Sequence, residues 1–366
     1  MTKPPDHDHY TRPLIKPRLL SFITTFKCTA ACRNCCFRCS PARTESLPLE
    51  SIRRIINEAA IIPEINVIVF TGGECFIERT KLIESINHAS SRGYITRCVS
   101  NAYWATDIVA AKKSIAELKE AGLAEINFSV GDNHLKFVPM RNVRNAAVAA
   151  CEAGLTTVIN IELFNGSRHR NKLESVFTDL RRSFSKLIVN CGLWIDRGDD
   201  IRIRHHKKYS LTNDVRARGC KSIISSLSVT PDEKLLACCG LLVEDVPEMV
   251  LGDLKKMSLS DLVNGQREDL LKCWIHLEGP QAVLDSTRSF DRSIRLKDTY
   301  VHPCQACRDL YKLKNRDAVV KACSEAAPKI YDRLLAVERF NECFAGIKGT
   351  TPMSSESRQN REALNG

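Results

Sequence analysis

Apolar positions in the first half of the chain follow two alternating patterns. Short apolar runs, typical of buried strands, are each followed by a stretch whose apolar residues recur at helical spacing. The runs that predict strands are 19–26, 65–70, 96–99, 125–130, 157–163 and 187–191. The stretches that predict helices are 49–60, 79–92, 108–121, 140–153 and 173–183. Three of these helices end just before a glycine, the residue best suited to the left-handed conformation that closes a helix.

Six β/α units in series predict an α/β fold with parallel strands and right-handed crossovers, as an open sheet or a partial barrel. This part is expected to span 19–196, after a short N-terminal arm at 1–18. From 197 to 317 we expect a second module that is rich in loops. A helical segment, interrupted at Pro328, is predicted for 318–347, and a polar, disordered tail for 348–366. The second module has one predicted helix, at 259–277.

The cysteine content is the most informative feature of the composition. The chain of 366 residues holds 17 cysteines, an odd number, and its first twenty residues lack the apolar core of a signal peptide. No uninterrupted apolar stretch approaches the ~18 residues of a membrane span. We therefore expect a cytoplasmic protein that does not cross a membrane, whose closely spaced cysteines bind a metal or an iron–sulfur cluster rather than form disulfides.

The net charge of +11 adds little to this interpretation. Basic residues are spread along the whole chain, aromatic residues make up only 6%, and no nucleic-acid-binding motif is present. Nucleic acid is therefore not an expected partner. The short basic run at 202–208 is interpreted as a solvated loop.

Five cysteines lie within residues 26–41, directly after the first strand, where parallel α/β enzymes place their sites. Cys28, Cys32 and Cys35 have the spacing CxxxCxxC. Zinc sites usually join two CxxC-type pairs, whereas three thiolates on a four-iron cluster leave one iron open for a substrate. Cys32, Cys35 and Cys39 form a second possible triple, and Cys36 and Cys39 have no predicted role.

This motif resembles that of the radical S-adenosylmethionine (SAM) enzymes, which carry CxxxCxxC after the first strand of a partial (β/α)6 TIM-type barrel. In that family a glycine-rich turn after the second strand receives the methionine amino group of SAM. Gly72, Gly73 and Glu74 match this turn. The resemblance implies a [4Fe-4S] cluster held by Cys28, Cys32 and Cys35 that cleaves SAM to a 5′-deoxyadenosyl radical. Many members have an aromatic residue where this chain has Asn34.

Further SAM contacts are implied at the ends of later strands. The residues at these positions are Ser100, Asn101, Ser129 and Asn160. Their alternative interpretation is that they are polar caps of strand ends. Asp132 and His134 could position substrate or cofactor, or have a structural role. Strand alternation allows Glu162, Trp194 and Asp196 to face the barrel interior.

A second set of cysteines lies in the C-terminal half. By geometry, four thiolates suit zinc and a [4Fe-4S] cluster equally. The layout resembles the SPASM or shorter twitch extension of radical SAM enzymes that act on peptides, which implies an auxiliary [4Fe-4S] cluster. Its implied ligands are Cys220, Cys238, Cys304 and Cys307. Several other cysteines lie on apolar faces and are predicted to be core residues: Cys98, Cys151, Cys191 and Cys273.

Cys239 directly follows the predicted ligand Cys238. Adjacent side chains of an extended segment point to opposite sides, so only one of the two can face the auxiliary cluster. The chain resembles radical SAM peptide epimerases over residues 19–312, which implies that Cys239 donates a hydrogen atom that turns an L-residue into a D-residue. It lacks the acidic residue that those enzymes carry between the positions of Cys220 and Cys238. In the alternative interpretation Cys239 is itself a cluster ligand.

Epimerisation of a ribosomally synthesised precursor peptide is therefore the expected reaction, with flavodoxin or ferredoxin as electron donor. Two alternatives share the architecture: a maturase that forms thioether or carbon–carbon crosslinks, and an enzyme that oxidises cysteine or serine to formylglycine. A non-catalytic zinc-binding adaptor is the alternative from another class. No leader-binding domain is expected, so peptide recognition would use the barrel mouth, the second module or a separate protein.

Overall fold

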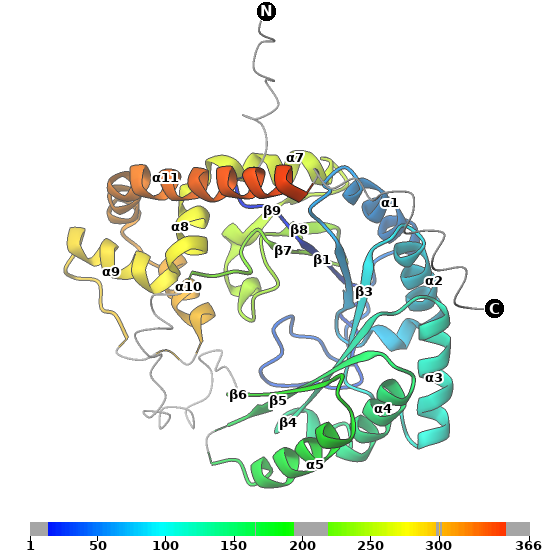
Figure 1. Ribbon diagram of the computed structural model, residues 1–366. Helices are drawn as coiled ribbons and strands as arrows, with labels where there is room; N and C mark the ends of the chain where they lie inside the picture. The colour runs from blue at the N-terminus through cyan, green and yellow to red at the C-terminus, as the bar shows by residue number, and fades with distance from the viewer. Residues whose placement is uncertain (1–13, 165, 194–218, 298–299, 301, 349–366) are drawn as a thin grey trace, which may run out of the picture.

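The computed structural model describes residues 14–164, 166–193, 219–297, 300 and 302–348. Six parallel strands curve around a common interior: β1 (Leu19–Ile23), β2 (Val67–Thr71), β3 (Ile95–Ser100), β4 (Glu125–Gly131), β5 (Thr156–Leu163) and β6 (Leu187–Leu193). Five helices cover their outer side: α1 (Leu49–Ala59), α2 (Arg79–Ser90), α3 (Ile108–Glu120), α4 (Met140–Glu152) and α5 (Arg170–Ser183) (Figure 1). The predicted α/β fold with a partial parallel barrel is confirmed.

The sheet continues beyond the barrel. Its nine strands are ordered β6-β5-β4-β3-β2-β1-β7-β8-β9. β7 (Ser226–Val229) is parallel to β1, whereas β8 (Lys234–Leu236) and β9 (Val250–Asp253) follow as an antiparallel extension. Because β7 pairs with β1, the residues that follow β8 are held next to the interior of the barrel.

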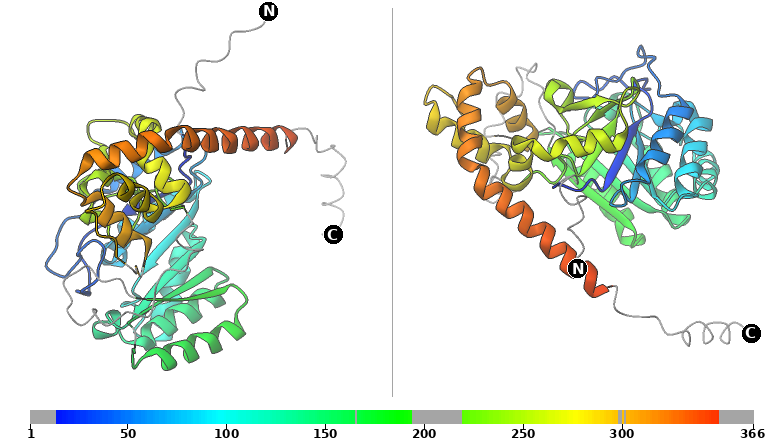
Figure 2. Two further views of the ribbon diagram at one scale, coloured as in Figure 1. Left: turned by 90° about the vertical axis from the view of Figure 1, so that its left-hand side faces the viewer. Right: turned by 90° about the horizontal axis from the view of Figure 1, so that it is seen from above.

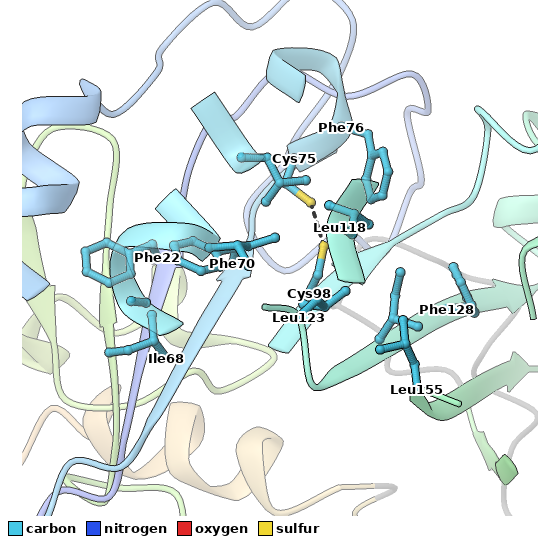
Figure 3. Close-up of a cluster of buried hydrophobic side chains, with 14 of the residues drawn as sticks. Phe22, Ile68, Phe70, Cys75, Phe76, Cys98, Leu118, Leu123, Phe128 and Leu155 are labelled. Atoms are coloured by element: carbon cyan, nitrogen blue, oxygen red, sulfur yellow. Dashed lines mark hydrogen bonds between the residues drawn. The ribbon is translucent and has the colours of Figure 1, made fainter. Parts of the chain in front are cut away.

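The main core lies between the sheet and the outer helices. Alternate strand residues point outward into it, including Phe22, Phe70 and Phe128, which are fully buried. Figure 3 shows this cluster, in which the sulfurs of Cys75 and Cys98 lie 3.3 Å apart. The intervening strand residues face the barrel interior, and several of these on β3 to β6 are polar. Strand alternation thus separates an apolar outer face from a polar inner face.

The C-terminal region contains more helix than the loop-rich module that we expected. Its helices are α7 (Leu259–Asn264), α8 (Leu270–Glu278), α9 (Pro280–Phe290), α10 (Pro303–Tyr311) and α11 (Arg316–Lys348). The single helix predicted for 259–277 is wrong: α7 ends at Asn264, and the Asp269 side chain caps a new helix by accepting from the Lys272 N–H. Because α8 and α9 bury apolar faces of their own, they pack as separate helices.

The predicted interruption at Pro328 is also wrong, since α11 continues through this residue. Proline removes one intrahelical hydrogen bond, and the adjacent turns of this long helix keep theirs. Figure 2 shows α11 running out beyond the body of the molecule. None of the described helices has the length and apolar character needed to cross a membrane. Trp194, Asp196, the basic run at 202–208 and most of both terminal segments lie outside the described residues.

At Gly131, the end of β4 lies very close to the backbone of β5. The φ of Gly131 is +154°, and a Cβ there would overlap the backbone of Glu162 on β5. We expect Gly131→Ala to lower the free energy of unfolding by about 2 kcal/mol or more, because backbone atoms cannot move aside. Gly192 occupies the same level on β6 and has open space around it, so Gly192→Ala is the matched control. Equal melting temperatures of the two variants would contradict this account.

Candidate active site

The segment between β1 and α1 folds back on itself and presents its cysteines to one cavity. Lys27 and Ser40 form a bridge across its base, and the Cys28 N–H donates to the Ser40 carbonyl at 3.1 Å. A tight turn follows, in which the Cys35 N–H donates to the Cys32 carbonyl. All five cysteines of this segment line a cavity of about 260 Å³: Cys28, Cys32, Cys35, Cys36 and Cys39.

The predicted ligand thiols have different environments. Burial raises the pKa of Cys28 to about 11 and that of Cys32 to about 12. Cys35 differs because the thiols of Cys36 and Cys39 donate to its sulfur, and these hydrogen bonds hold its pKa well below that of a free thiol. Buried thiols that lie close together cannot all become thiolates, because their negative charges repel one another. Binding of a positively charged metal group would allow all three sulfurs to ionise. The set therefore suits an iron–sulfur cluster, with Cys36 and Cys39 beside it.

The glycine-rich turn after β2 pairs with the start of the cysteine segment. The Gly73 N–H donates to the Thr25 carbonyl at 2.7 Å, and the Glu74 N–H donates to the Lys27 carbonyl at 2.9 Å. A Cβ on Gly72 or Gly73 would overlap this neighbouring backbone. The two glycines line the cavity, and they also allow the chain to approach itself. Their contact with SAM stays a prediction.

Glu74 lies behind the cavity wall rather than on it. Its carboxylate is fully buried and accepts from the Asn101 N–H at 2.8 Å, the Ser100 hydroxyl at 2.9 Å and the Phe76 N–H at 3.2 Å. Burial raises the pKa of Glu74 to about 7, although these donors favour the ionised form. Glu74 thus joins the turns that follow β2 and β3. Its predicted contact with the methionine amino group stays a prediction.

Three of the other predicted SAM contacts line the cavity: Ser100, Asn101 and Ser129. The Asn101 side-chain amide donates to Thr29 Oγ1 at 3.0 Å and lies 3.8 Å from the Cys28 sulfur. Asn160 is beside Ser129 in the strand register but is not part of the cavity wall. Its side chain instead accepts from the Asn190 amide on β6.

The opposite wall contains a polar chain that the sequence motif does not reveal. Asn34 donates from its amide to the Glu162 carboxylate at 3.3 Å and accepts from the Asn133 amide at 2.8 Å. Glu162 and His134 line the cavity beside Asn34. The position that is aromatic in many radical SAM enzymes is thus a hydrogen-bonding link between the cysteine segment and the ends of β4 and β5.

Asp132 has a structural environment. It accepts from the Phe164 N–H at 2.8 Å and from the Ser167 hydroxyl. These bonds fix the loop after β5.

Leu241 and Leu242 contribute an apolar wall to the cavity from the C-terminal region, and the sequence did not predict either. Nothing in a leucine pair distant in sequence indicates such a position.

The C-terminal cysteines gather from three elements. α10 places Cys304 and Cys307 three residues apart on one helical face, capped by His302. Cys220 is placed by the hydrogen bond from its N–H to the Ile275 carbonyl on α8. Burial raises the pKa values of Cys238, Cys304 and Cys307, and each is raised further by neighbouring thiols of this set.

No three His, Cys, Asp or Glu side chains of the described residues converge closely enough to ligate a single metal ion. The ligands of a four-iron cluster bind different irons and need not converge on one point. Among the remaining cysteines, Cys98 and Cys273 are buried as predicted, whereas Cys151 is half-buried. Cys191 is exposed because its strand, β6, lies at the described edge of the sheet.

Cys238 and Cys239 have different surroundings. The sulfurs of Cys238 and Cys304 both lie within 3.5 Å of the point where a Cβ on Gly240 would stand. Cys239 is exposed, yet crowding by surrounding protein atoms raises the pKa of its thiol, and the neighbouring Cys220 thiol raises it further. The positive charge of Arg97 opposes this rise. Arg97 lies on β3 and pairs with Glu125 on β4 at 2.8 Å.

Comparison with known proteins agrees with this geometry. The sequence profile of the Radical SAM superfamily matches residues 22–166. Over 119 residues the chain is 28% identical to the "Putative peptide biosynthesis protein YydG" of Bacillus subtilis (strain 168). That match covers 32% of this chain and 37% of the relative, so the chain spans well under half the length of the relative that it matches.

Two solved structures are also similar. Native anSMEcpe with bound AdoMet has a TM-score of 0.49 at 16% identity, covering 87% of this chain and 99% of that one. BtrN in complex with AdoMet and 2-DOIA has a TM-score of 0.44 at 12% identity, covering 73% of this chain and 89% of that one.

The parallel partial barrel, the cysteine segment after β1 and the glycine turn after β2 define a barrel enzyme with an iron–sulfur site. The profile match makes the class specific: residues 22–166 match the Radical SAM superfamily, whose enzymes use a [4Fe-4S] cluster and SAM.

The hydrogen bonds of the Glu74 carboxylate can be tested by substitution. In Glu74→Gln one of the two backbone N–H donors, of Phe76 or Asn101, must face an amide NH2, so it loses its acceptor. We expect the variant to be about 1–3 kcal/mol less stable, measured by denaturant unfolding. Glu50→Gln is the control, since its side chain is 81% exposed. Unchanged stability of Glu74→Gln would show that the carboxylate does not join the two turns.

Proposed function

We propose that this chain is a radical SAM peptide epimerase in which Cys239 donates a hydrogen atom to the Cα of a substrate residue. The observation that carries the proposal is the difference between two adjacent thiols. Both thiols lie near the other C-terminal cysteines, but Cys239 is the exposed one, and it is close enough to Arg97 on β3 for that positive charge to act on it. A hydrogen donor must be reachable by substrate, and a cluster ligand need not be.

The cofactor residues follow from the cavity. Cys28, Cys32 and Cys35 would hold the [4Fe-4S] cluster, and the cavity-lining residues toward SAM would be Gly72, Gly73, Ser100, Asn101 and Ser129. Two further SAM contacts are proposed outside the cavity wall: Glu74, which lies behind it, and Asn160, which is beside Ser129 in the strand register. When bound, the reduced cluster and SAM supply a 5′-deoxyadenosyl radical that removes a hydrogen atom from the substrate. The apolar wall of Leu241 and Leu242 would exclude water from this reactive region.

The step assigned to Cys239 is a hydrogen-atom transfer. Its S–H bond breaks, a C–H bond forms on the opposite face of the substrate Cα, and the residue becomes D. Cys239 is left as a thiyl radical, so each turnover needs one electron and one proton to restore the thiol. A low-potential donor such as flavodoxin or ferredoxin would supply the electron, and solvent the proton. Cys220, Cys238, Cys304 and Cys307 would hold an auxiliary [4Fe-4S] cluster next to this thiol.

A ribosomally synthesised peptide is the proposed substrate. The name of the Bacillus subtilis relative refers to peptide biosynthesis, which supports this substrate class. The barrel's inner face also carries charged and amide side chains, which are paired with one another in this structure: Arg97 with Glu125, and Asn160 with Asn190. Amide and charged side chains of this kind pair with the N–H and C=O groups that an extended peptide exposes.

Iron content distinguishes the two cysteine sets. Replacing Cys28, Cys32 and Cys35 with Ala should remove one cluster and all SAM cleavage, because no open iron remains. Replacing Cys304 and Cys307 should lower the iron content and leave some cleavage. Cys323→Ala controls for loss of a half-buried thiol from the same region. Iron and sulfide are measured after anaerobic purification, with 5′-deoxyadenosine formation as the second measurement. Unchanged iron in the Cys304/Cys307 variant would exclude the auxiliary site, and two zinc ions per chain would exclude the enzyme.

Reaction in deuterium oxide tests Cys239. Its thiol proton exchanges with solvent, so the product should gain one mass unit at the Cα of a residue that hydrolysis shows to be D. Cys239→Ala should retain 5′-deoxyadenosine formation and lose the D-residue, because abstraction precedes donation. Cys238→Ala should instead lose auxiliary iron.

Cys191→Ala removes another exposed thiol and should leave the D-residue unchanged. Deuterated D-product from Cys239→Ala would place the donor at another thiol. A wild-type product two mass units lighter would replace epimerisation with crosslinking.

A further inference from the structure

The cysteine segment after β1 packs into the core of the C-terminal region rather than into that of the barrel. Phe26, Phe37 and Cys39 are buried in a second apolar cluster, separate from the one between sheet and outer helices. Trp274 of α8 and Tyr311 of α10 belong to the same cluster. The conformation of the predicted SAM-cluster ligands therefore depends on how the C-terminal region is seated.

One carboxylate joins the two regions. Asp245 ends a short 3₁₀ turn, Val243–Asp245, directly after the cavity-wall residues Leu241 and Leu242. Its Oδ1 accepts from Arg38 Nη2 at 3.0 Å, and its Oδ2 lies 3.8 Å from Arg308 Nη1. Arg38 belongs to the cysteine segment.

Arg308 is next to Cys307 on α10, so Asp245 stands between the two cysteine sets. The side chains of Asp245 and Arg308 are 9% and 8% exposed, whereas that of Arg38 is 66% exposed. Removing the carboxylate charge therefore takes one acidic neighbour from a buried arginine, which keeps Asp309 at 3.8 Å. Because this pair is shielded from solvent, we expect a larger perturbation than from loss of a surface ion pair.

Arg38 also has an unusual backbone conformation. Its φ is +48°, in the left-handed region that is unfavourable for a residue with a side chain. The Arg38 N–H closes a turn onto the Cys35 carbonyl at 3.2 Å. The Arg38 side chain pairs with Asp245, and this contact stabilises the strained turn. The turn begins at Cys35, a predicted cluster ligand.

We propose that Asp245 is a positioning residue that seats the Leu241–Leu242 wall against the cysteine segment and so shields the cavity from solvent. It acts through Arg38 and Arg308 and does not itself line the cavity. The proposal rests on the assignment of Cys28, Cys32 and Cys35 as cluster ligands, and it does not depend on which reaction the enzyme performs.

The test measures the cluster and not the product. Wild type, Asp245→Asn and Arg38→Gln are purified anaerobically with their clusters and exposed to air, and loss of the cluster's visible absorbance is followed with time. Electron paramagnetic resonance (EPR) spectra of the reduced proteins are recorded with and without SAM. Glu248→Gln is the matched control, because Glu248 lies in the same segment and pairs with Arg316 at 2.7 Å but not with the cysteine segment.

We expect Asp245→Asn to lose its cluster several-fold faster than wild type and to show a weaker SAM-induced change in the EPR spectrum. Arg38→Gln should shift both measurements in the same direction by a smaller amount. Because it changes only an exposed side chain, this variant still tests the proposal if Asp245→Asn does not fold. Asp245→Glu should restore much of the wild-type behaviour. The proposal is overturned if Arg38→Gln and Asp245→Asn both behave like Glu248→Gln. Absence of a SAM-responsive cluster in the wild type would instead contradict the proposed function.

Discussion

The cavity depends on one backbone contact, the pairing of the Gly72–Gly73 turn with Thr25 and Lys27. This contact extends the parallel pairing of β1 and β2 past the ends of the strands, so the cysteine segment and the glycine turn leave the sheet side by side. Any side chain on either glycine would separate them. The Glu74 carboxylate accepts hydrogen bonds from Ser100 and Asn101, so the turn after β3 is joined to the turn after β2. Three neighbouring strand ends are thereby held as one wall.

The remaining walls come from distant parts of the chain. Asn34 joins the cysteine segment to β5 through Glu162, whereas Leu241 and Leu242 approach from beyond β8. These walls are possible because β7 pairs with β1 and brings the C-terminal region against the open side of the barrel. A cavity built in this way combines buried thiols with few compensating charges, an environment in which a bound metal cluster stabilises the thiolate state.

Much of the fold was predictable because the β/α alternation leaves little choice. Each apolar run with a helical stretch behind it formed the expected unit, and α1 begins at Leu49, the predicted first residue. The errors arose where local patterns were ambiguous. An apolar stretch from 259 to 277 does not show that Asp269 will cap a second helix, and a proline inside a long helix need not end it. Asn160 and Glu162 have equivalent alternation, yet only Glu162 lines the cavity, because it lies at the end of β5.

By itself, the sequence determined the local features of this protein: the spacing of Cys28, Cys32 and Cys35, the glycines after β2, and the adjacency of Cys238 and Cys239. These follow from residue type and short-range geometry, which neighbouring residues decide. Only the tertiary structure decided that Leu241 and Leu242 close the cavity, that Asn34 meets Glu162, and that Asp245 stands between Arg38 and Arg308. Such contacts join residues more than sixty positions apart, and their partners are selected by packing of the whole sheet, which no local pattern encodes.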